Sequence, residues 1–188
     1  MATHRYLLVC AAALFIATPT PSLADDPAAN FVTRLFAEVC IPNMGHPDKV
    51  RAWADQKKLP RIENPEALRV FVGAGEKGSA WYLPSRLGSF SLSIRGTTEA
   101  CAVWAREANP AEVDTMFRKI MEGVNRPGLQ VAIFDQQNRL TPVGEARSLE
   151  YSVRPTTGPN GFLFTLLTSQ NPGSAFQASM QVARSVFQ

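Results

Sequence analysis

The chain has 188 residues, of which 45% are hydrophobic and 19% charged, and its formal net charge at pH 7 is +3. The Lys and Arg residues are scattered along the sequence, whereas a nucleic-acid-binding protein presents a concentrated basic face, so we expect no nucleic-acid partner. No run of apolar residues reaches the roughly 20 that a transmembrane helix needs, so we expect no transmembrane segment in the mature chain.

The first 24 residues have the organisation of a secretory signal peptide. Arg5 is followed by a short apolar run, and small residues stand just before Asp25, as they do at a signal-peptidase site. We therefore predict that residues 1–24 are removed by cleavage near Ala24 and that the mature protein, residues 25–188, is periplasmic or secreted. Its length is that of a single domain.

Pairs of a capping residue and a proline mark the predicted helix starts. Asp26, Asn64 and Asn109 each precede a proline, and this order is typical of the N-cap and the first helical position. The first of these helices, over residues 26–39, has apolar residues at helical spacing and leads directly to a cysteine. A further helix is predicted to begin at an Asp48 cap.

Alternating apolar and polar residues predict strands in the second half of the chain. Phe90, Leu92 and Ile94 share one face of a strand, and residues 101–105 form its antiparallel partner. The last third is predicted to be a β-meander with strands at residues 129–134, 149–154, 162–169 and 176–182. A terminal helix is the alternative for the last segment. Helices early and strands late predict an α+β fold, with the N-terminal helices packed on one face of an antiparallel sheet.

Two cysteines remain once the leader, which contains Cys10, is removed. Cys40 and Cys101 form an even pair in an oxidising compartment, which favours a disulfide between them. Two free buried thiols, or a nucleophilic Cys40 beside His46, are the alternatives. Lipidation at Cys10 is disfavoured because Val9 stands where a lipoprotein has a small residue.

A catalytic site that needs a histidine would have to use His46, because the mature chain contains no other. A hydrolase would combine it with Asp48 or a serine, but the sequence lacks the Gly-x-Ser-x-Gly elbow. The segment Gly73–Gly78 matches G-x-G-x-x-G, yet a helix is expected before it and a strand after it, the reverse of a phosphate-binding loop. Glu145 and Glu150 would form a glycosidase-type pair only if they faced one cleft. We therefore predict no catalytic residues, no metal and no cofactor.

Aromatic residues provide a candidate binding surface made of Trp81, Tyr82 and Trp104. In the strand that holds Cys101, Trp104 has the parity opposite to Cys101 and Val103, so it faces the other side of the sheet if those two face the core. An exposed aromatic residue there would mark a contact surface. Helices that cover this face are the alternative.

The chain resembles a family of small, uncharacterised proteobacterial periplasmic proteins and lipoproteins with two cysteines. The resemblance extends over about residues 28–125 and rests on a helix ending in Cys40, Trp81, the segment at residues 87–92, and Cys101. It implies secretion and a disulfide-tied α+β fold, and it supplies no catalytic residues.

The sequence thus predicts a non-catalytic periplasmic or secreted binding domain. Its partner would be an envelope protein or another envelope component, recognised by strand addition or by aromatic side chains. One alternative is a hydrolase centred on His46. Another is a carrier of a small apolar ligand, with an apolar pocket between the helices and the sheet. The sequence does not indicate an oligomeric state.

Overall fold

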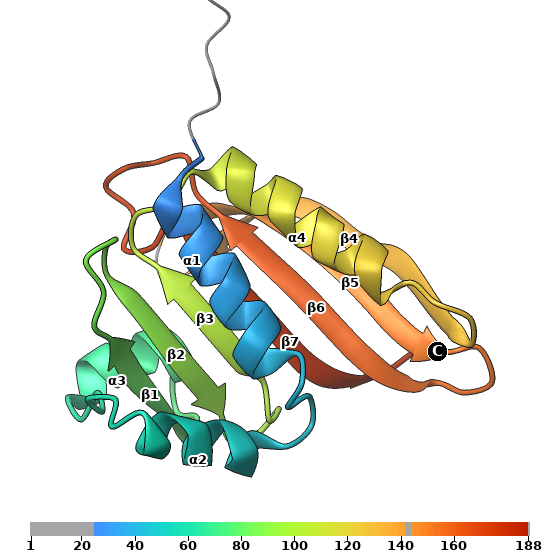
Figure 1. Ribbon diagram of the computed structural model, residues 1–188, viewed down its shortest axis with the longest axis horizontal. Helices are drawn as coiled ribbons and strands as arrows, with labels where there is room; N and C mark the ends of the chain where they lie inside the picture. The colour runs from blue at the N-terminus through green and yellow to red at the C-terminus, as the bar shows by residue number, and fades with distance from the viewer. Residues whose placement is uncertain (1–24, 142–143, 188) are drawn as a thin grey trace, which may run out of the picture.

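A single antiparallel sheet forms the centre of the computed structural model, which describes residues 25–141 and 144–187. Its seven strands lie in the order β1-β2-β3-β7-β6-β5-β4 (Figure 1). The strands are β1 (Gly78–Leu83), β2 (Phe90–Arg95), β3 (Cys101–Ala105), β4 (Leu129–Thr141), β5 (Gly144–Pro155), β6 (Asn160–Thr168) and β7 (Ala178–Val186). The predicted signal peptide lies outside the described residues.

Two antiparallel meanders, β1–β3 and β4–β7, join at the middle of the sheet. There β7 pairs with β3, and Val103 stands opposite Met180. The α+β class, the antiparallel sheet and the C-terminal β-meander are therefore confirmed. The last segment is a strand, so the helical alternative for it is wrong.

Most of the helices lie on one face of the sheet, as Figure 1 shows for α1 and α4. The helices are α1 (Pro27–Leu35), the π-helical turn η1 (Phe36–Cys40), α2 (Pro47–Gln56), α3 (Pro65–Val72) and α4 (Pro110–Val124). Helix α3 departs from the expected layout and packs on the opposite face, where Phe71 and Val72 meet Ala102 and Trp104. We call the face under α1 and α4 the helix face and the other the α3 face.

The three predicted capping pairs start helices as expected. Asp26, Asn64 and Asn109 each accept a hydrogen bond from the first turn of their helix, as Asp26 does from the backbone N–H of Ala28 at 2.9 Å. The predicted Asp48 cap is wrong, because the N-cap of α2 is His46. Pro47 takes the first helical position instead and supplies a φ angle that already suits a helix.

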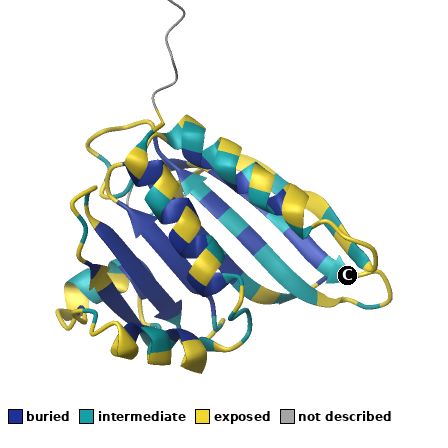
Figure 2. Cartoon of the chain, viewed as in Figure 1, coloured by how far each residue is buried: buried dark blue, intermediate teal, exposed yellow. Residues whose placement is uncertain are grey.

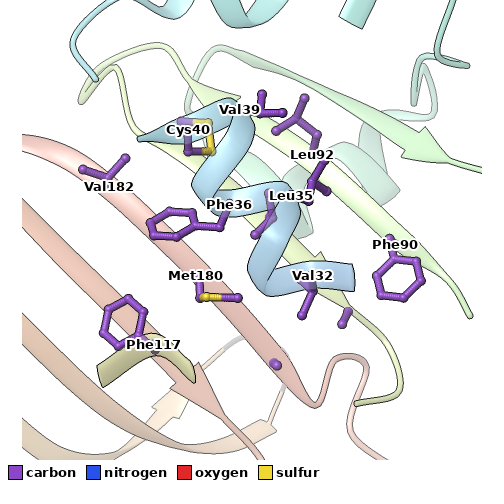
Figure 3. Close-up of a cluster of buried hydrophobic side chains, with 14 of the residues drawn as sticks. Val32, Leu35, Phe36, Val39, Cys40, Phe90, Leu92, Phe117, Met180 and Val182 are labelled. Atoms are coloured by element: carbon purple, nitrogen blue, oxygen red, sulfur yellow. A yellow bond between two sulfur atoms is a disulfide. The ribbon is translucent and has the colours of Figure 1, made fainter. Parts of the chain in front are cut away.

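The main core lies between the sheet and the helices of the helix face. Figure 3 shows Phe36 of η1 among side chains from β2, α4 and β7. Its ring lies 6.3 Å from the ring of Phe117 and 6.2 Å from that of Phe164, so η1 joins α4 and β6. Every residue of β3 is buried (Figure 2), because helices cover that strand on both faces.

A disulfide joins Cys40 at the end of η1 to Cys101 at the start of β3. The bond spans 61 residues of sequence and confirms the predicted pairing, so both thiol alternatives are wrong. In the chain-entropy model, a disulfide that closes a loop of this length adds about 4 kcal/mol to the free energy of unfolding, because it restricts the unfolded chain. The bond also fixes the point at which the chain leaves η1 for the loop at residues 41–45.

Candidate functional site: an apolar groove on the helix face

The three aromatic residues of the candidate surface do not form one exposed patch. Trp81 packs in the main core and Trp104 in the α3 cluster, on opposite faces of the sheet, and both are buried. Tyr82 is exposed. The predicted binding surface is therefore corrected: two of its members are core residues.

Trp104 occupies a closed aromatic cluster. Its indole N–H donates to Ser93 Oγ at 2.9 Å, and its ring contacts those of Phe71 and Phe176. Its parity relative to Cys101 was predicted correctly, but α3 covers it.

The groups considered for catalysis are separated. His46 is exposed, and no hydrogen bond or ion pair joins its ring to another residue of the described ranges. Glu145 lies opposite Leu140 and is exposed, whereas Glu150 is buried and lies 3.0 Å from Arg139. An odd spacing along β5 places the two carboxylates on opposite faces, so they do not share a cleft.

The segment Gly73–Gly78 is a connection from α3 to β1, in the order that the sequence predicts. Gly73 ends the helix with φ +97°, and Gly75 has φ +75°. No helix follows that could direct its N-terminus at a phosphate.

The two outer strands of the sheet, β1 and β4, differ in whether their outer edge is open to a partner strand. The β1 edge is occupied by the preceding segment, since the N–H of Tyr82 donates to the carbonyl of Pro60 at 2.9 Å. The β4 edge is open within the described residues, but it has a register shift between Ile133 and Asp135 and a charged pair of Asp135 and Arg139. Bulges and charges of this kind disfavour strand addition.

An apolar groove lies on the helix face, at the end of the sheet that α4 leaves uncovered. Its volume is about 810 Å³, within the range of small-molecule sites. Val153, Phe162 and Arg184 form one row of its floor, since Val153 pairs with Phe162 and Phe162 with Arg184. Val186, which is 70% exposed, continues the floor toward the end of β7.

Two segments form the walls of this groove. Ile41 and Met44 stand on one side, immediately after the disulfide-bonded Cys40, and Val124 at the end of α4 stands on the other. Figure 1 shows the loop after α1 and the C-terminal end of α4 on either side of β6. The groove is therefore bounded by an anchored loop and by the last turn of a packed helix.

The charges along the groove are positive. Arg126 and Arg184 line it, and its lining contains no Asp or Glu among the described residues. Arg184 is held by Glu99 and Gly45, whereas the exposed guanidinium of Arg126 has no hydrogen bond or ion pair to any described residue. An apolar floor with a free cation at its margin suits a ligand that has an apolar part and an anionic group.

The sequence suggested an apolar pocket as one alternative, but it did not identify the residues that line it. A pocket between helices and sheet was one of the predicted alternatives. Its lining residues come from the loop at 41–45, from α4 and from all strands of the second meander. Val153 and Phe162 were predicted as members of strands, but no feature of the sequence marked them as groove residues.

No metal-binding cluster of three or more His, Cys, Asp or Glu residues is present in the described ranges. Nor is any described helix long and apolar enough to span a bilayer. Comparisons with protein-family models, with curated proteins and with solved structures find no match to this chain. The resemblance to small proteobacterial periplasmic proteins therefore stays a prediction.

Proposed function

We propose that this protein is a non-catalytic binding domain that acts outside the cytoplasm and holds a small acidic amphiphile in the groove on the helix face. The observation that carries the proposal is the combination of an apolar floor, formed by residues such as Phe162 and Val153, with the unpaired Arg126 at the margin. The proposal combines two functions predicted from the sequence: a binding domain for an envelope component and a carrier of a small apolar ligand.

The magnitudes of the expected interactions suit a molecule with one alkyl chain. Each buried CH2 group contributes about 0.8 kcal/mol, so about ten of them exceed the several kcal/mol that association costs. A charged hydrogen bond or ion pair at the margin adds about 1 kcal/mol when it is solvent-exposed. After the association cost is subtracted, we expect a sub-millimolar dissociation constant for a twelve-carbon acid.

The disulfide supports the proposed location. Cys40–Cys101 bonds of this kind persist in the periplasm or outside the cell, where the environment is oxidising. The predicted leader at residues 1–24 would direct the chain there. The same bond anchors the first residue of the groove wall, Ile41, to the core.

Titration calorimetry with three ligands of equal chain length tests the function. Dodecanoate, dodecanol and dodecyltrimethylammonium differ only in their head groups. We expect dodecanoate to bind most tightly and the cation to bind most weakly. Val186→Glu places a carboxylate in the floor and is expected to weaken dodecanoate binding at least tenfold.

A matched control comes from another exposed hydrophobic residue outside the groove. Leu87→Glu makes the same kind of change at a residue that is 47% exposed, and it should leave binding unchanged. The proposal is overturned if dodecanoate does not bind at millimolar concentration, or if Val186→Glu and Leu87→Glu behave alike. Binding of an apolar helical peptide in place of all three amphiphiles would also overturn it.

A further inference from the structure

We propose a second binding site, on the α3 face, for a small polar anion that carries a carboxylate or phosphate group. A pocket of about 380 Å³ lies there between the C-terminal end of α3 and the part of β4 near Leu140. It is separate from the apolar groove, because the sheet stands between them. Arg69, Arg95 and Arg139 all line it.

The floor of this pocket combines apolar side chains, Leu163 and Leu167 of β6, with polar ones. Thr165 on β6 and Ser179 and Gln181 on β7 line it, and the register places Thr165 opposite Gln181. None of the three side chains has a hydrogen-bond partner among the described residues. The hydroxyl and amide groups of the floor therefore offer donors and acceptors to a ligand that has hydroxyl groups of its own.

Arg95 is the residue that points to a ligand. Its Nε is buried and has no hydrogen-bond partner within the described part of the chain. A buried donor without an acceptor costs about 1–3 kcal/mol. An oxyanion that receives two parallel hydrogen bonds from the guanidinium would remove this cost.

Arg69 adds a second free cation. It lies in the last turn of α3 and is exposed, and its guanidinium makes no ion pair or hydrogen bond with any described residue. Arg139, by contrast, is engaged by Asp135 at 2.6 Å and by the buried Glu150 at 3.0 Å. Two carboxylates thus outweigh the charge of Arg139, and one of them, Glu150, also lines the pocket. The unpaired positive charges of Arg69 and Arg95 lie on the α3 side, so the anionic group is expected there.

This arrangement selects by charge and by hydrogen bonding. Arg95 and Arg69 bind the anionic group, and the polar side chains of the floor bind the hydroxyl groups next to it. A sugar phosphate or a sugar acid has both features. A neutral sugar lacks the first and an alkyl carboxylate lacks the second.

Calorimetry at low ionic strength with glucose 6-phosphate, glucuronate and glucose tests the site. We expect at least one of the two anions to bind and glucose not to bind, and the tighter anion identifies phosphate or carboxylate as the preferred group. Arg95→Gln and Arg69→Gln are each expected to weaken anion binding at least tenfold. Arg69 is exposed, so its variant reports on the site even if Arg95→Gln impairs folding.

Two control variants test whether the loss of binding is specific to this pocket. Arg86→Gln removes an exposed arginine elsewhere, and Arg126→Gln alters the apolar groove; neither should change anion binding. The proposal is overturned if neither anion binds at millimolar concentration, or if Arg69→Gln binds as tightly as Arg86→Gln. Its failure would leave the amphiphile proposal standing, since the ligands and the residues differ.

Discussion

The guanidinium of Arg184 donates a hydrogen bond to the carbonyl oxygen of Gly45 at 2.6 Å, across 139 residues of sequence. The same side chain lies 3.5 Å from Glu99. Gly45 has φ +73°, and a Cβ atom there would lie 2.5 Å from Arg184 Nε. The loop that forms one wall of the groove is thus fastened to β7, which forms part of its floor, at a position whose positive φ favours glycine.

Replacement of Gly45 by alanine tests this attachment. We expect Gly45→Ala to lower the free energy of unfolding by about 1–2 kcal/mol, because alanine is strained at positive φ and its methyl group displaces Arg184. Urea denaturation measures the change. Gly123→Ala is the control: it lies within α4 with open space around it, so it should be neutral or slightly stabilising. Equal effects of the two variants would contradict this account of the loop.

The disulfide gives a second prediction. Replacing both Cys40 and Cys101 by alanine should lower the free energy of unfolding by about 2–4 kcal/mol. A reducing agent should destabilise the wild-type protein by a similar amount and leave the double variant unaffected. A wild-type protein whose urea midpoint does not respond to reduction would contradict the role assigned to this bond.

The aromatic residues give a third prediction. Trp104→Ala should cost about 3–5 kcal/mol of stability, because it empties a buried cluster and leaves Ser93 without its hydrogen-bond donor. Tyr82→Ala should change stability by less than about 0.5 kcal/mol, since the side chain is exposed. Thermal unfolding of the two variants and the wild-type protein measures these differences in stability. A mild effect of Trp104→Ala would show that the residue is not a core residue.

The parts of the fold that could be predicted from the sequence are those set by local chemistry. The caps at Asp26, Asn64 and Asn109 depend on a side chain and its own first turn, and the strand at Phe90 depends on alternation. The position of α3 on the opposite face could not be predicted, because its apolar residues suit either face. Trp104 is buried because α3 lies on this face.

The long ends of β4 and β5 were missed for a different reason. Residues 135–139 are polar on both faces, so they lack the alternation that marks a half-buried strand. Backbone pairing with β5 makes them a strand. The α3-face pocket, which Arg139 lines, could therefore not be predicted from sequence patterns, and neither could the groove, whose residues are distant in sequence.

The Asp135–Arg139 pair gives a prediction on pH. The hydrogen bond from Arg139 holds the pKa of the Asp135 carboxyl below its ordinary value of 3.8, with a smaller contribution from Gln137. Because the folded pKa lies below the unfolded one, the ionised carboxylate stabilises the fold at neutral pH, and this contribution is lost as pH falls through the lowered pKa. Arg139→Gln should raise the pKa toward 3.8 in an NMR titration of the carboxyl carbon. An unchanged pKa in that variant would exclude Arg139 as the cause.

Backbone NMR of the ¹⁵N-labelled protein during addition of dodecanoate tests the central claim most directly. We predict that the largest shift changes fall at residues 41–44, 124–129, 153–162 and 184–186, which come together only at the groove. These shift changes should saturate at millimolar ligand and become smaller in Val186→Glu. No change at saturating dodecanoate, or changes centred on α3 or on His46, would contradict the assignment of this groove as the binding site.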